Sequence, residues 1–376
     1  AEADEQGRFK LNPFPGAFFD VTAHAADGEP YLTVHKIVEW PTGARRHQVE
    51  LALPRGVLVH GRLIEAGDGR PVAGAGIQYM PRSNNAFVTP ELVTGWQDMT
   101  VSGKDGTIRM AVPPGSGHLL VKGSTGDHVH DEIGERELQN GQPGGGRLYP
   151  DAVVALDIPE GTQTHEVEAT MKRGVTVQGR LVGPDGQEVD KAIMVCKLNL
   201  SPSEFYWRFG QEIAGGRFEL HGCDRDVSYQ VMFLDSEHEC GATATIDGRA
   251  ARDEPLLVQL SPCGTASVRF LGMDKKPLQK LDFSPQLVVT PGASRFDMKA
   301  REQGSLAADS DFLANIDRRH YWDGPKTDEQ GRVTYPALIP GATYRIAAVS
   351  AGVLREFVAI SGKTIELADV ELDLGQ

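Results

Sequence analysis

The stretch Arg55–Leu63, RGVLVHGRL, decides the fold because it returns further along the chain as Arg173–Leu181, RGVTVQGRL. A weaker third copy is Cys263–Phe270, CGTASVRF. In each copy valine or phenylalanine recurs at every second position, which is the pattern of a strand with one buried face. Because self-similarity at a long period marks a repeat architecture, the sequence predicts tandem units of β-structure.

The residues that follow each copy are repeated as well. A turn rich in Gly, Asp and Pro comes first, and a second alternating strand comes after it. Closing strands are expected at His47–Leu51 and His165–Ala169. Short strands separated by turns at this spacing are typical of β-sandwiches. We therefore predict an all-β chain of tandem Ig-like or transthyretin-like β-sandwiches, with one short helix in the last unit.

The repeats divide the chain into four parts. Half a sandwich buries too little apolar area to stand alone, so we expect the first part to pack on the second, or its missing front half to have been trimmed away. The short helix is expected at Asp309–His320, where Phe312, Leu313 and Ile316 lie on one helical face. The predicted parts are the second half of a truncated sandwich unit at 1–54, a unit at 55–171, a unit with clustered cysteines at 172–261, and a unit at 262–376 with a long insert at 290–327.

Composition narrows the classes of partner. The 376 residues carry a formal net charge of −14, and an acidic chain is poorly suited to bind nucleic acid. Hydrophobic residues make up 40% of the chain, enough to bury real cores. There is no run of 18 apolar residues, the length that a membrane-spanning helix needs, so we expect no membrane span in this chain.

Three sets of segments carry a family resemblance: Val59–Leu63 with Gly69–Ala75, Val177–Leu181 with Pro184–Gly186, and Thr327–Val333 with Ile339–Arg345. With them the chain resembles tandem carboxypeptidase regulatory-like domains, which are transthyretin-like β-sandwiches. The whole chain, including Gly144–Pro150 and Asp311–Asp317, also looks like the long C-terminal tails of some bacterial membrane-tethered regulators, such as extracytoplasmic-function sigma factors. That second likeness implies an extracytoplasmic location, periplasmic or on the cell surface, with a tether in a missing N-terminal part.

Clustered cysteines and histidines form the first candidate site. Two His-x-Cys units, His221 with Cys223 and His238 with Cys240, have the ligand types of a tetrahedral zinc site, although their spacing matches no standard zinc motif. In an oxidising compartment, disulfides are favoured over the metal, and buried free thiols are the remaining alternative. The cysteines available for such bridges are Cys196, Cys223, Cys240 and Cys263.

A second candidate metal site is Gly126–Glu132, GDHVHDE. It places His128 and His130 beside three carboxylates, a set that suits a transition metal or Ca²⁺. Solvated loop residues near the end of a strand explain the same pattern equally well.

Aromatic residues suggest a third kind of site. Adjacent residues of a strand point to opposite faces, so the run Phe205–Trp207 is expected to expose at least one ring, with core packing of two of the three as the alternative. Exposed rings suit sugar stacking or contact with a protein. The candidate ligand-binding rings are Trp96, Tyr206, Trp207 and Trp322.

The Gly-x-Ser-x-Gly elbow of serine hydrolases does not occur in the sequence. We expect no enzyme, no catalytic residue and no cofactor. The sequence favours a non-catalytic extracytoplasmic binding or spacer array that mediates protein interaction or sensing through a protein partner. The alternative is a carbohydrate-binding array with starch-binding-like units that recognises a cell-surface glycan.

Overall fold

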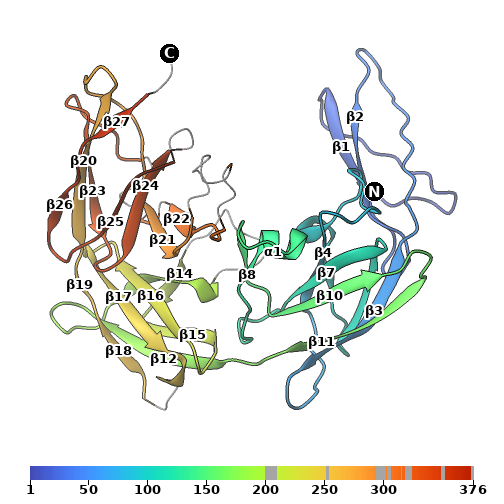
Figure 1. The fold of residues 1–376 in the computed structure, drawn as a ribbon, viewed down its shortest axis with the longest axis horizontal. Coiled ribbons are helices and arrows are strands. Elements are labelled where there is room, and N and C mark those ends of the chain that lie inside the picture. Colours follow the sequence, from blue (N-terminus) through green and yellow to red (C-terminus); the bar gives the residue numbers. More distant parts are fainter. Residues whose placement is uncertain are drawn as a thin grey trace.

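The structure is a computed structural model, and it describes residues 1–199, 210–250, 254–293, 302, 306–314, 316–317, 324–348 and 352–373. It confirms the predicted all-β fold class of tandem β-sandwiches. The sandwiches form a bent array with two arms (Figure 1). One arm holds the N-terminal segment and the first sandwich, and the other holds the second and third sandwiches. In the described part of the chain, no helix is long and apolar enough to cross a membrane.

The first sandwich packs a three-stranded sheet, β11-β3-β6, against a four-stranded sheet, β10-β7-β4-β5. Inward residues of β3, such as Val59 and Leu63, share one core with Ile77 and Leu119 of the other sheet. Its elements are β3 (Val57–Glu65), β4 (Gly76–Pro81), the 3₁₀ helix η1 (Gly95–Asp98), β5 (Thr100–Val101), β6 (Thr107–Val112), β7 (Gly115–Lys122), β10 (Ala152–Ile158) and β11 (Thr164–Met171).

The second sandwich repeats this plan with its own central strand, β12. Like β3, this strand pairs antiparallel with one neighbour, β15, and parallel with the closing strand, β18. Its elements are β12 (Val175–Val182), β13 (Lys191–Cys196), η2 (Lys197–Asn199), β14 (Gln211–Ala214), β15 (Arg217–Cys223), β16 (Ser228–Asp235), β17 (Cys240–Asp247), η3 (Gly248–Ala250), β18 (Leu256–Gln259) and β19 (Ser261–Pro262).

The third sandwich has β20 in the central place. This strand pairs antiparallel with β23 and parallel with β26 and β27, so the weak third copy of the repeated sequence forms the same strand. Its elements are β20 (Gly264–Gly272), β21 (Gln286–Thr290), β22 (Asp311–Ala314), β23 (Arg332–Leu338), β24 (Thr343–Ala348), β25 (Gly352–Val358), β26 (Thr364–Glu366) and β27 (Val370–Leu372).

The predicted helix in the last unit is wrong for the residues that the structure describes there. Asp311–Ala314 forms strand β22, which pairs antiparallel with β21. The apolar residues Phe312 and Leu313 have a spacing compatible with either structure, and pairing with a neighbouring strand decides between them. Asp309 and Ser310, Ile316 and Asp317 are also described and are not helical, and the remaining positions of the predicted helix, 315 and 318–320, lie outside the described residues.

The N-terminal segment contributes a two-stranded antiparallel ribbon, β1 (Phe18–Ala23) with β2 (Val34–Glu39). Its buried Leu32 donates a backbone hydrogen bond to Pro54, and Thr33 accepts one from Val93 of the first sandwich. The segment therefore packs on the first sandwich. The strand predicted at His47–Leu51 does not form.

Residues 123–151, between β7 and β10, connect the two arms, and we call them the bridging loop. They contain β8 (Ile133–Gly134), α1 (Glu135–Asn140) and β9 (Arg147–Leu148). Leu138 and Leu148 of the loop pack on Leu120, which projects from the outer face of the first sandwich. Helix α1 lies between the two arms (Figure 1).

The end of the bridging loop enters the third sandwich. Tyr149 is fully buried and belongs to the third hydrophobic core. Its hydroxyl donates to Asp311 Oδ2 at 2.5 Å and lies 3.1 Å from Thr290 Oγ1. Arg147 donates to the carbonyl oxygen of Pro291 at 2.6 Å. Burial raises the pKa of both Tyr149 and Asp311, so the phenol keeps its proton and donates it.

The second and third sandwiches share apolar packing. The larger sheet of the second sandwich turns Met194 and Phe233 into its own core. From the opposite face, Met232 and Leu234 of β16 join the core of the third sandwich. A sheet covered on both faces has near-continuous apolar strands, which explains the run Val231–Leu234.

Replacing Tyr149 by phenylalanine should weaken the joint between the arms. The ring still fills the third core, but Asp311 and Thr290 lose a buried partner, so we expect a loss of about 1–3 kcal/mol in the free energy of unfolding. Urea unfolding measures the loss, and small-angle X-ray scattering measures the separation of the arms. The control is Tyr31→Phe, at a tyrosine that is 40% exposed. Equal stability of the two variants and unchanged scattering would contradict a role of this hydroxyl in the joint.

Candidate functional site

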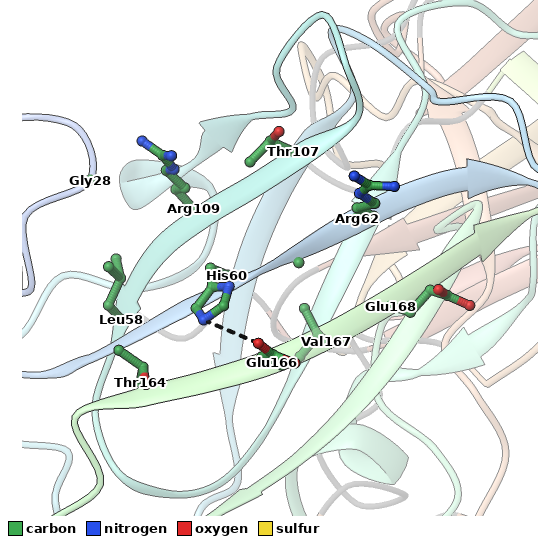
Figure 2. A pocket seen from close by; sticks show the side chains of 11 residues that line it. Gly28, Leu58, His60, Arg62, Thr107, Arg109, Thr164, Glu166, Val167 and Glu168 are labelled. Atoms are coloured by element: carbon green, nitrogen blue, oxygen red, sulfur yellow. Dashed lines mark ion pairs between the residues drawn. The ribbon is translucent and has the colours of Figure 1, made fainter.

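A groove of about 640 Å³ lies on the outer face of the first sandwich (Figure 2). It crosses the sheet β11-β3-β6 on the side opposite the core. Side chains alternate along a strand, so Val57, Val59 and Leu63 of β3 face inward while His60 and Arg62 face the groove.

Strand register arranges the charged side chains of the groove in two rows. Arg109, His60 and Glu166 are consecutive partners across β6, β3 and β11. Thr107, Arg62 and Glu168 form the next row. The cationic side chains therefore lie over β6 and β3, and the carboxylates over β11. The His60 ring lies 3.8 Å from the Glu166 carboxylate and links the two halves.

The two arginines of the groove have spare binding capacity. Within the described part of the chain, neither guanidinium makes a hydrogen bond or an ion pair. Hydrogen bonds from Thr107 and, to a smaller extent, the charge of Arg62 hold the pKa of Asp105 below its usual value. Beside Arg109 the wall of the groove is the backbone of Gly28, a residue in the left-handed region with φ of 82°.

The groove was not among the sites predicted from the sequence, although the sequence contains a signal for it. His60 and Arg62 occupy the outward positions of the repeated strand, and Glu166 and Glu168 the alternate positions of a predicted strand. The sequence does not show that these two strands pair in parallel. No local pattern specifies a pairing between segments so far apart in the chain.

The predicted metal site at His221 and Cys223 does not assemble. Residues two apart on a regular strand share a face, but Gly222 between them has φ of 69° and breaks the alternation. Cys223 is buried in the second core, whereas the His221 ring pairs with Glu219 at 3.2 Å. A side chain at position 222 would collide with the backbone of Gly126 and His128, so the bridging loop requires this glycine.

The other half of the predicted metal site lies on a different sheet. His238 pairs with Asp235 at 2.8 Å, and the Cys240 thiol donates to the backbone oxygen of His238. Among the residues that the structure describes, no group of three or more His, Cys, Asp or Glu side chains converges as metal ligands. The zinc prediction is therefore corrected: each half has local partners of its own.

The second predicted metal site is divided in the same way. His128 is buried and lies 3.2 Å from Glu65 Oε1, which also accepts a bond of 2.5 Å from Arg173. This cluster joins the first sandwich to the second. The His130 ring instead meets the edge of Tyr149, with 5.5 Å between ring centroids. Burial, and then the charges of Lys122 and Lys197, lower the pKa of His130 to about 3.

The structure holds the four cysteines as free thiols, and a disulfide among them stays a prediction. Cys196, Cys223 and Cys240 pack in the second core, and Cys263 packs against the third core. Burial raises the pKa of Cys196 to about 11 and that of Cys223 to about 12. They pack as small apolar side chains.

The aromatic residues predicted to bind a glycan are not placed by the structure. Tyr206, Trp207 and Trp322 lie outside the described residues. Trp96 lies in the 3₁₀ helix η1, and the position of its ring is not described. Sugar binding by these residues stays a prediction.

No protein-family model matches the chain, and no curated protein matches it. Among solved structures, it is similar to a streptococcal ancillary pilin, at 12% identity over 66% of this chain and 75% of the pilin, with a TM-score of 0.32. The Bacillus anthracis TIE protein matches at 12% identity over 89% of this chain and 53% of its own, with a TM-score of 0.22. Shaft pilin SpaA from Lactobacillus rhamnosus GG matches at 9% identity over 56% and 98%, with a TM-score of 0.25. These similarities assign the chain to no family.

The low pKa of His130 makes stability depend on pH. The unfolded chain binds a proton at this residue near pH 6.5, and the folded chain near pH 3, so stability falls as the pH drops through that window. We expect the wild type to lose about 1–3 kcal/mol more than His130→Phe between pH 7 and pH 4.5. Urea unfolding at both pH values measures this difference. Parallel losses would show that the folded protein accommodates a protonated His130.

Free thiols predict a simple labelling result. Denatured protein treated with an alkylating reagent should take up one label on each of its four cysteines, with or without prior reduction. Native protein at neutral pH should react slowly, because burial disfavours the thiolate. Intact mass spectrometry counts the labels. Fewer labels without reductant would show a disulfide, and zinc retained in the native protein would restore the metal site.

Proposed function

We propose that this chain is a non-catalytic scaffold outside the cytoplasm, which displays the charged groove of its first sandwich to a protein partner. The groove, with its two arginines free of ion pairs in the described structure, is the observation that carries this proposal. Charged side chains at a binding surface speed association and exclude partners of the wrong charge.

The joints between the sandwiches support the scaffold part of the proposal. The Tyr149–Asp311 hydrogen bond joins the first sandwich to the third, and the Glu65–Arg173 pair joins the first to the second. Shared apolar packing joins the second to the third. Of these joints, the shared apolar packing is the kind that restricts motion between domains. The buried polar groups near the joints, such as Tyr149 and Glu65, therefore hold sandwiches together. This structural role favours a scaffold over an enzyme.

The location rests on the family resemblance. The repeated strand, turn and strand segments resemble carboxypeptidase regulatory-like domains and the extracytoplasmic tails of bacterial regulators. A fold alone does not specify a function, so we propose the protein partner from the groove itself.

Site-specific photo-crosslinking in the native host tests this function. A photoreactive amino acid replaces Thr164, which lines the groove. The matched control is Thr364, which occupies the same register position in the third sandwich, opposite Thr265 as Thr164 is opposite Leu58. We expect a crosslinked protein at position 164 and none at position 364. Absence of a protein adduct at position 164, or equal adducts at both positions, would overturn the proposal.

A further inference from the structure

We propose that the groove binds an extended peptide segment of its partner that carries an acidic residue beside a basic one. The acidic side chain meets Arg62 and Arg109, and the basic side chain meets Glu166 and Glu168. This ligand class rests on the proposed function, because it specifies what the partner presents to the groove.

The dimensions of the sheet match such a segment. Neighbouring strands lie about 4.8 Å apart, so the distance from the cationic strands β6 and β3 to the anionic strand β11 is one to two such spacings. Alternate residues of an extended peptide are about 6.6–6.8 Å apart. A peptide that crosses the strands can therefore place an acidic residue over Arg62 and a basic residue, two positions on, over Glu166 or Glu168.

The other two sandwiches provide an internal comparison. At equivalent register positions of the third sandwich, Arg332 is bonded to Glu366 at 2.7 Å, so that face neutralises its own charges. In the second sandwich Glu219 pairs with His221 at 3.2 Å, and Arg180, the equivalent of Arg62, lies 3.9 Å from Glu188. On the groove face of the first sandwich, the ion pair among the described residues is a weak one, with His60 3.8 Å from Glu166. Its charges therefore remain available to a ligand.

The charge pattern also decides against other ligands. A uniform polyanion, such as a nucleic acid or a carboxylated polysaccharide, would be repelled by Glu166 and Glu168 in the groove. It would also be repelled by the net charge of −14 on the whole chain. A neutral glycan is usually held by stacking on the rings of Trp, Tyr or Phe, and the residues that line the groove include none of these three. Arginine is the side chain best matched to a carboxylate, which it binds through two parallel hydrogen bonds.

Selection from a random peptide library displayed on phage tests the ligand class. Peptides are selected on the wild-type protein and then measured by fluorescence anisotropy on the double variant Arg62→Ala/Arg109→Ala. We expect binding to fall at least tenfold on this variant and to stay unchanged on Arg269→Ala, the equivalent position in the third sandwich. Unchanged melting curves confirm that the exposed substitutions leave the fold intact.

The composition of the selected peptides distinguishes the outcomes. Peptides that depend on the two arginines should carry an acidic and a basic residue separated by one position. Selection on Glu166→Lys/Glu168→Lys should return peptides without the basic residue. Uniformly acidic peptides from the wild type, or competition by polygalacturonate, would overturn the mixed-charge ligand. They would leave the proposed function standing if the crosslink at Thr164 is found, whereas loss of that crosslink overturns the function itself.

Discussion

The buried hydrogen bond between Tyr149 and Asp311 is the interaction on which the bent arrangement of the sandwiches depends. Tyr149 lies between two strands of the first sandwich along the chain, but its side chain packs in the core of the third sandwich. Leaving a buried hydroxyl without a hydrogen-bond partner lowers the free energy of unfolding by about 1–3 kcal/mol. Separation of Tyr149 from Asp311 is therefore unfavourable unless the tyrosine leaves the core. Arg147 reinforces the contact through two backbone carbonyls, those of Thr290 and Pro291. The bridging loop thereby holds the two arms at one separation.

This contact acts together with the two-sided burial of the second sandwich. Strand β16 presents Val231 and Phe233 to one core, and Met232 and Leu234 to the next. Movement of the third sandwich would uncover apolar side chains of the second, at about 25 cal/mol for each Å² exposed. The second sandwich is thus held between its neighbours, by packing on one side and by the Glu65–Arg173 pair on the other.

Local sequence patterns predicted the strands and their repetition because alternation and glycine turns are local. Gly61 and Gly179 recur in the repeated strand since a side chain at either would collide, with the backbone of Val167 or the ring of Phe218. Predictions failed where tertiary contacts decide. Pairing with β21 makes residues 311–314 a strand, and contact with the bridging loop gives Gly222 the conformation that separates His221 from Cys223. The continuous apolar run Val231–Leu234 is a local pattern that indicates a strand buried on both faces.

Comparison among the repeats separates structure from recognition. Positions that face the cores keep their apolar character in all three sandwiches, as at Val59, Val177 and Ala266, because each supports the same packing. Outward positions of the same sheets are released from that constraint, and some of them differ, although Arg62 recurs as Arg180 and Arg269. Thr107 of the first sandwich corresponds to Arg332 of the third by register, and Arg332 neutralises Glu366 there. With threonine in that place, the groove side chains Arg62, Arg109, Glu166 and Glu168 are without strong partners in the described structure. The groove therefore depends on a few outward residues that differ among sandwiches of the same fold. Changes at such positions can alter binding specificity without loss of the fold.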